Sequence, residues 1–190
     1  MELFGFSTNN YKGRELDFIS LNCEDTLLKN KEVRQAINYA IDKNKINSSV
    51  FSNNYYVSSF PIDYGSYLYE KESSSNYNKE KAKEVLENAG WEYRYGYWRK
   101  TENYTTRYLN LNLIVDNSNK TRVKVAELIE DQLEDIGINV SLYKVSNSSY
   151  KNYLKNKNYD MIISGVNNGY SPDLTYFLGE DNIANYENTE

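Results

Sequence analysis

The sequence predicts an α/β fold, a mixed sheet built around parallel strands that are joined by right-handed βαβ crossovers. Two observations support this prediction. Apolar and polar residues alternate over residues 109–115 and 138–142, and a third, short apolar segment spans residues 159–164. Helical segments lie between them, at residues 118–136 and 146–157. The length of 190 residues suffices for one well-buried domain, and 20 tyrosines and 6 phenylalanines supply large side chains for its core.

The N-terminal part is expected to hold two extended segments followed by two helices. Residues 2–11 and 15–22 alternate as extended segments, which predicts a hairpin or an edge ribbon. Residues 33–41 place apolar side chains at helical spacing, and Asn30 is positioned to cap that helix. Residues 43–50 predict a second, short helix.

The middle of the chain combines a long loop, a helix and an aromatic hairpin. Asparagine, serine and tyrosine dominate residues 51–78, which predicts an irregular surface segment. A helix is expected over residues 79–89, with Asn78 as its N-cap and Gly90 as its left-handed end. The aromatic residues of 91–100 then predict a β-hairpin.

The boundaries in the second half follow from capping residues. Ser118 or Asn119 is expected to cap the helix that begins there, and Gly137 to end it. The apolar face of that helix repeats every three to four residues, so it should pack on the sheet. Its inward residues are Val125, Leu128, Ile129, Leu133 and Ile136.

The composition excludes several classes of function. The sequence has no histidine and a single cysteine, so Ser-His-Asp catalysis, Cys-His catalysis and a zinc site lack their usual residues. No glycine-rich phosphate loop occurs, and we expect no cofactor and no metal. The net charge of −5 without a basic stripe argues against nucleic acid. No apolar run reaches the roughly 20 residues of a membrane span. Cys23 ends an alternating segment and is expected in the core.

Acidic residues offer a possible acid–base device. Glu130 and Glu134, like Asp131 and Asp135, lie four residues apart on one helix surface. A glycosidase-like site would need such a pair, but the polar side of an amphipathic helix explains both pairs better. The acidic and amide residues of 116–119 likewise resemble an N-cap cluster more than a calcium loop, since they lack the glycine of the sharp turn.

The candidate ligand site follows the third predicted strand. In open α/β sheets, ligands bind in the crevice outside the carboxyl ends of the strands. Gly165 and Gly169 allow close approach of the backbone, and the neighbouring amides and tyrosine can donate and accept hydrogen bonds. The alternative is a plain loop that closes with Pro172 in the first turn of a short helix, residues 173–178. The candidate ligand-binding residues are Val166, Asn167, Asn168, Gly169, Tyr170 and Asp173.

Four motifs in order resemble one family. They are Val33-Arg34-Gln35-Ala36-Ile37-Asn38-Tyr39-Ala40-Ile41-Asp42-Lys43, the helix end Ala82–Trp91, Gly137-Ile138-Asn139-Val140, and Tyr159-Asp160-Met161 followed by Gly165 and Pro172-Asp173. Together they are similar to the family 5 extracytoplasmic solute-binding proteins of oligopeptide/nickel-type ABC importers. The resemblance spans roughly Asn22 to Asp173.

The resemblance implies a binding protein rather than an enzyme. It implies a type II periplasmic-binding-protein-like lobe, with residues 1–190 as the single ligand-closing lobe of a longer two-lobed chain. It also implies an oligopeptide or other small solute as ligand, hinge closure during uptake, and ABC permease subunits as partners of the full-length protein. The implied location is extracytoplasmic, as a periplasmic protein or a Gram-positive cell-surface lipoprotein, through a leader that this sequence does not contain.

The sequence departs from the family pattern at the peptide anchor. Peptide binders of the family commonly carry tryptophan directly after the glycine and an acidic residue a few positions on, where this chain has Val166 and Gly169. Asp173 is the nearest carboxylate. Two other function classes stay open: an effector or sensor module of a regulator with the same fold, and a carboxylate-based hydrolase.

Overall fold

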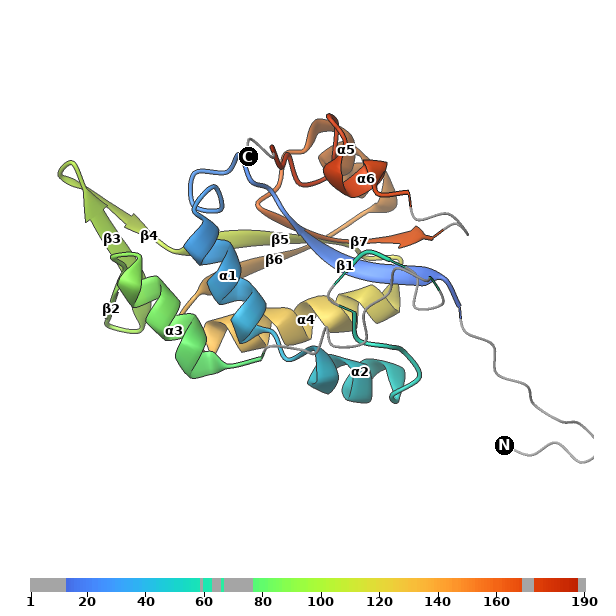
Figure 1. Ribbon diagram of the computed structural model, residues 1–190, viewed down its shortest axis with the longest axis horizontal. Coiled ribbons are helices and arrows are strands. Elements are labelled where there is room, and N and C mark those ends of the chain that lie inside the picture. Colours follow the sequence, from blue (N-terminus) through green and yellow to red (C-terminus); the bar gives the residue numbers. More distant parts are fainter. Residues whose placement is uncertain (1–12, 59, 63–65, 67–76, 169–172, 188–190) are drawn as a thin grey trace, which may run out of the picture.

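The centre of the molecule is a four-stranded mixed sheet with the strand order β1-β7-β5-β6 (Figure 1). A computed structural model of the chain describes residues 13–58, 60–62, 66, 77–168 and 173–187. Strands β5, β6 and β7 are parallel, whereas β1 runs antiparallel to β7, so the predicted mixed sheet is confirmed. The strands are β1 (Glu15–Leu21), β5 (Asn110–Asp116), β6 (Asn139–Val145) and β7 (Met161–Asn167).

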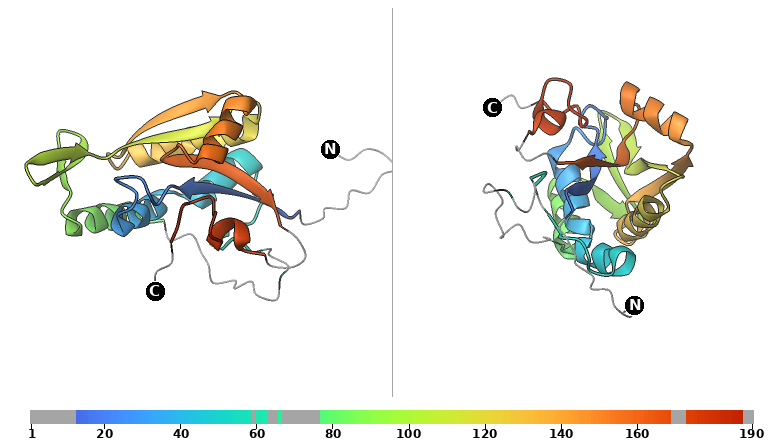
Figure 2. Two further views of the ribbon diagram at one scale, coloured as in Figure 1. Left: turned by 90° about the horizontal axis from the view of Figure 1, so that it is seen from above. Right: turned by 90° about the vertical axis from the view of Figure 1, so that its right-hand side faces the viewer.

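Helices cover both faces of this sheet (Figure 2). The larger core cluster joins one face to α1, α2, α3 and α4, and includes Leu111, Leu113 and Ile163. The smaller cluster joins the other face, through Ile114 and Ile162, to α5 and α6. Successive side chains of a strand point to opposite faces of the sheet. Leu113 and Ile114 of β5 therefore belong to different clusters, as do Ile162 and Ile163 of β7. The helices are α1 (Lys31–Ala40), α2 (Lys43–Phe51), α3 (Lys79–Asn88), α4 (Lys120–Glu134), α5 (Asn147–Asn156) and α6 (Thr175–Leu178).

Polar side chains begin the long helices, as predicted. Asn30 accepts hydrogen bonds from the backbone N–H groups of α1, and Asn78 does the same for α3. Of the two candidates for α4, Asn119 is the cap, because its side chain accepts from the backbone of Arg122. Ser118 instead donates to Asp116 at the end of β5. These local hydrogen bonds satisfy backbone donors that have no partner inside the helix.

A second sheet contains the predicted aromatic hairpin and a third strand that was not predicted from the sequence. It consists of β2 (Glu92–Arg94), β3 (Tyr97–Glu102) and β4 (Thr105–Tyr108). All four residues of β4 are exposed, so the strand shows no apolar alternation. The turn into it uses Asn103 and Tyr104 at φ 48° and 64°, positions where glycine is the usual signal. Both signals of a strand were therefore missing.

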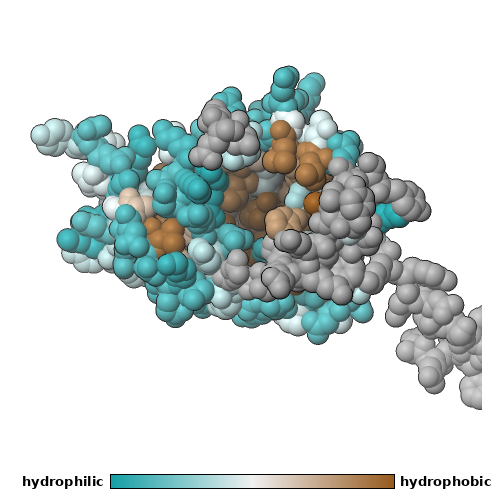
Figure 3. Space-filling model, in the orientation of Figure 1, coloured by the Kyte–Doolittle hydropathy of each residue, from teal (hydrophilic) through white to brown (hydrophobic). Residues whose placement is uncertain are grey.

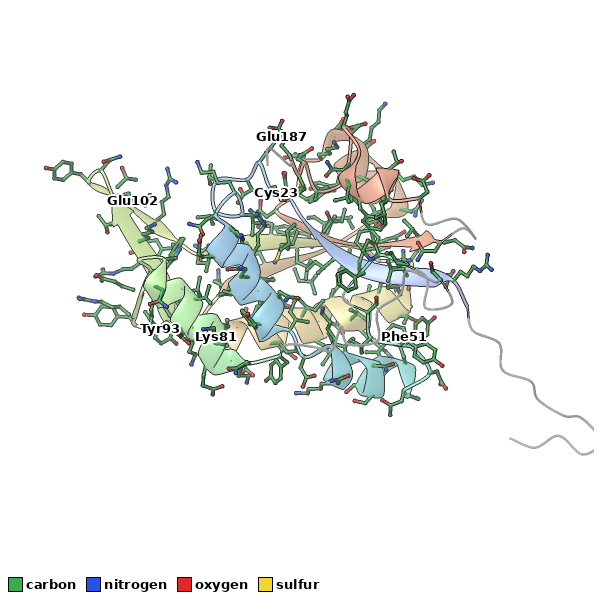
Figure 4. All side chains as sticks on the ribbon, in the orientation of Figure 1. Cys23, Phe51, Lys81, Tyr93, Glu102 and Glu187 are labelled. Atoms are coloured by element: carbon green, nitrogen blue, oxygen red, sulfur yellow. The ribbon has the colours of Figure 1, made fainter. Side chains whose placement is uncertain are left out.

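At β1, one expectation stays untested and another needs correction. Its described partner is β7, and residues 2–11 of the predicted ribbon lie outside the described part of the chain. Cys23 was expected in the core, but it is only half-buried, because β1 ends two residues earlier. Its backbone N–H donates to the oxygen of Ala184 at 2.7 Å, which ties this connection to the C-terminal segment that carries Glu187 (Figure 4).

Candidate functional site

A cavity of about 430 Å³ lies between β1 and the helices α1, α2 and α4. Its volume falls within the ~300–1,000 Å³ that is typical of small-molecule sites. Figure 3 shows hydrophobic residues gathered in the middle of this face of the molecule. Phe51, at the end of α2 (Figure 4), and residues 55–58 and 60–61 close one side. Apolar side chains that line the cavity include Ile19, Leu21, Ile37, Ile41, Ile46 and Val125.

An ion pair forms part of the wall of this cavity. Oδ1 of Asp17, on β1, accepts a hydrogen bond from Nε of Arg122 at 2.9 Å and lies 2.7 Å from Nη2 of the same guanidinium in an ion pair. The two side chains are only 26% and 24% exposed. Arg122 lies one and two helical turns before Val125 and Ile129, so it shares the inward face of α4. Salt screens a partly shielded pair of this kind less than it screens a fully exposed pair.

Gly165 is the residue of β7 directly opposite Asp17. A Cβ atom at this position would lie 2.0 Å from Nη2 of Arg122 and 2.6 Å from Oδ1 of Asp17. The glycine therefore makes room for the ion pair, and a side chain there would have to displace it.

We expect Gly165→Ala to lower the free energy of unfolding by about 1–2 kcal/mol, because the new methyl group displaces the guanidinium. In an Arg122→Ala background the same substitution should cost less, since the nearer obstructing group is gone and the carboxylate of Asp17 is no longer held in place by the ion pair. Urea unfolding of the four proteins in this double-mutant cycle measures the coupling, which should exceed about 0.5 kcal/mol. An equal cost of Gly165→Ala in both backgrounds would contradict the assignment.

The predicted ligand residues after β7 are partly strand. Val166 pairs with Leu16, and Asn167 pairs with Glu15, so the strand runs three residues beyond its predicted end. The reason is tertiary: β1 supplies a hydrogen-bonding partner as far as Glu15. Asn168 continues this pairing, because its N–H donates to the oxygen of Arg14 at 3.0 Å.

The other candidates lie farther along the chain. Gly169 and Tyr170 are outside the described residues. Asp173 is exposed and accepts a hydrogen bond from the N–H of Thr175 at 2.9 Å. Hydrogen bonds from the side chain and backbone of Thr175 lower the pKa of Asp173. Val166, Asn167, Asn168 and Asp173 are not among the described residues that line the cavity.

The sequence did not predict the cavity or the charged residues that line it. The available signal was Arg122, a charged residue on the otherwise apolar face of a helix. Its partner Asp17 could not be identified, because the two lie 105 positions apart. Lys43, the first residue of α2, also lines the cavity, and burial lowers the pKa of its ammonium group.

The acidic residues of α4 form a solvated face. Asp131, Glu134 and Asp135 are exposed, and Asp135 pairs with Lys79 at 2.9 Å. Burial, followed by the charge of Glu134, raises the pKa of Glu130. A glycosidase-like pair would have to face a shared cleft. These carboxylates therefore give no support to the hypothesis of a carboxylate-based hydrolase.

The described ranges give no support for a metal site or a membrane span. Those residues include no group of three or more acidic, cysteine or histidine side chains that could hold a metal ion. Asp116 instead accepts hydrogen bonds from Ser118 and Asn147, as expected for an N-terminal cluster. No helix in the described part of the chain has the length and apolar character needed to cross a membrane.

Comparison with known proteins identifies the family. The profile described as "Bacterial extracellular solute-binding proteins, family 5 Middle" matches residues 4–182. The chain belongs to this family. The sequence resemblance and the expected type II periplasmic-binding-protein-like fold of the family 5 chain are thereby confirmed.

Two curated proteins illustrate the relationship. The oligopeptide-binding protein AppA of Bacillus subtilis is 30% identical over 146 residues, which cover 75% of the family 5 chain and 26% of AppA. The heme-binding protein A of Haemophilus influenzae is 27% identical over 180 residues, which cover 92% of this chain and 31% of that protein. The chain therefore spans between a quarter and a third of the length of these relatives.

A solved structure extends the comparison to three dimensions. The structure of AppA in complex with a nonapeptide superposes with a TM-score of 0.83 at 27% identity. The match covers 93% of the family 5 chain and 37% of the AppA chain. Nearly the whole chain thus shares its fold with one part of a larger binding protein.

Proposed function

We propose that this chain is the ligand-closing lobe of an extracytoplasmic solute-binding protein that delivers a peptide-like solute to an ABC importer. The observation that carries the proposal is the similarity to AppA, whose solved structure contains a nonapeptide. Because the chain matches only 37% of that structure, we place the remainder of the site on a second lobe of a longer protein. ABC permease subunits would be the partners of that longer protein.

The proposed mechanism is hinge closure. A ligand that bridges two lobes makes contacts in the closed state that the open state lacks, and this difference in affinity shifts the population toward closure. One lobe alone supplies only part of those contacts, so we expect the isolated chain to bind weakly. No covalent chemistry is required of any residue.

The first test is native mass spectrometry of the full-length protein that carries this chain, purified without added ligand. Co-purified peptides, released on activation and sequenced, are the expected result. A bound species that is not a peptide, such as a tetrapyrrole, would overturn the proposed ligand class. A protein that emerges empty and then fails to bind a random peptide library would overturn it as well.

The end of β7 is proposed as a ligand contact of this lobe. Asn167→Ala and Tyr170→Ala in the full-length protein should each weaken peptide binding by about fivefold, the loss of roughly 1 kcal/mol expected for one hydrogen bond. Asn167 is exposed at the end of its strand, so its replacement should leave folding intact. Titration calorimetry measures the affinity, and Asn152→Ala, an exposed position on α5, is the control. Unchanged affinity in both test variants would make this segment a connector only.

A further inference from the structure

Lys43 is a half-buried cation whose charge no described residue compensates. It is the first residue of α2, immediately after the N-cap Asp42, and it lines the cavity. Asp42 accepts from the backbone of Lys45, and the described residues give the Lys43 ammonium neither a hydrogen bond nor an ion pair. Burial alone accounts for the lowered pKa of Lys43. Removing an ammonium group from water without supplying an acceptor is unfavourable.

The other charges of the cavity wall are balanced or solvated. Arg122 is neutralised by Asp17, which accepts a hydrogen bond from its Nε and forms an ion pair with its Nη2. Glu15 also lines the cavity, but it is exposed at the start of β1 and forms no ion pair with Lys43. Water can therefore solvate the charge of Glu15. Lys43 is left as the group that gains most from an anionic partner inside the cavity.

We propose that this cavity binds a carboxylate attached to an apolar group, with Lys43 as the counter-ion and the surrounding aliphatic and aromatic side chains holding the apolar part. The volume of about 430 Å³ leaves room for a side chain together with its carboxylate. Ile41, Ile46 and Phe51, on the same stretch of chain as Lys43, line the cavity and supply apolar contacts. The arrangement matches the common design of ligand sites, in which few polar groups orient a mostly apolar ligand.

Two sources can supply this chemistry. One is the C-terminal residue of a peptide, and the inference then rests on the proposed function. The other is a free aliphatic carboxylic acid. The structure assigns the carboxylate and its apolar neighbour in either case, and the test separates the two sources.

The test compares the free acid and the C-terminal amide of Ala-Ala-Phe, together with decanoate, on the full-length protein. Titration calorimetry should show about tenfold tighter binding of the free acid than of the amide, as expected for a charge-assisted hydrogen bond. Lys43→Met removes the charge and keeps the aliphatic stem, so this preference should vanish. Lys45→Met is the matched control: Lys45 lies on the same helix, is exposed and does not line the cavity, so the preference should survive.

A second measurement uses only the unmodified protein. Acetylation by acetic anhydride, mapped by mass spectrometry, should be slower at Lys43 when the free-acid peptide or decanoate is present, and unchanged at Lys45. Protection by decanoate with no binding of either tripeptide would retain the carboxylate site but overturn the peptide function. Peptide binding without protection of Lys43, or a free-acid preference that persists in Lys43→Met, would overturn the inference and leave the proposed function standing.

Discussion

Replacing Trp98 with alanine should lower the free energy of unfolding by about 4 kcal/mol, within the ~3–5 kcal/mol seen for large aromatic residues in cores. Trp98 is 1% exposed, and its Nε1 donates a hydrogen bond to the oxygen of Ile136 at 2.7 Å. The substitution therefore removes a ring from the core and leaves a buried carbonyl group without its partner. Urea unfolding, followed by circular dichroism, measures the change.

Two further variants test whether the cost comes from the loss of the buried ring and of its hydrogen bond. Trp98→Phe keeps most of the apolar surface but loses the hydrogen bond, so its cost should be intermediate. Tyr97→Ala removes an adjacent aromatic residue that is 51% exposed, and should change stability by less than about 0.5 kcal/mol. Equal costs for Trp98→Ala and Tyr97→Ala would show that the second sheet does not anchor to the core through Trp98.

The second large effect on stability is expected at Gly137, which lies three residues after the end of α4. Its φ of 86° lies in the left-handed region, and an added Cβ would lie 2.3 Å from the ring of Tyr93. That ring packs against Trp98 with their centroids 5.1 Å apart, which restricts its movement away from Gly137. Gly137→Ala should therefore cost about 3 kcal/mol, from roughly 1–2 for the backbone and roughly 1–2 for overpacking.

A matched glycine isolates the two causes. Gly96 has a similar φ of 88°, but an added Cβ would meet no atom within 4 Å. Gly96→Ala should consequently show only the backbone cost, about 1–2 kcal/mol. In a Tyr93→Ala background the cost of Gly137→Ala should fall to the same level. If Gly137→Ala is no worse than Gly96→Ala, steric contact with Tyr93 is not responsible.

The cavity and the end of β7 meet at the Asp17–Arg122 pair. Both charged residues line the cavity, and Gly165 beneath them immediately precedes Val166, the first of the candidate ligand residues. The Gly165→Ala cycle and the Lys43→Met titration therefore probe neighbouring parts of one face by independent readouts. The first reports on stability and the second on the recognition of a carboxylate.

Local signals explain why most elements were predictable. Helix α1 begins at its expected cap because the side chain of Asn30 and the backbone donors it satisfies are three residues apart at most. Strand β5 was predictable because leucines alternate with polar residues along it, and the fold buries those leucines. The start of α4 was predictable from Asn119. The four family motifs are also read along the chain, so the family was predictable before any fold was known.

The remaining features depend on partners that are distant in sequence. The antiparallel pairing of β1 with β7 lengthened β7 to Asn167, because hydrogen bonds from β1 extended the strand past its apolar residues. Strand β4 pairs with β3 although all of its side chains are exposed, so no periodicity marked it. The helices, the parallel core and the family could all be predicted from the order of residues along the chain. The fold alone placed Arg122 on Asp17 and half-buried Lys43 where no described residue gives it a counter-ion, because burial and charge pairing arise only when separate segments pack together.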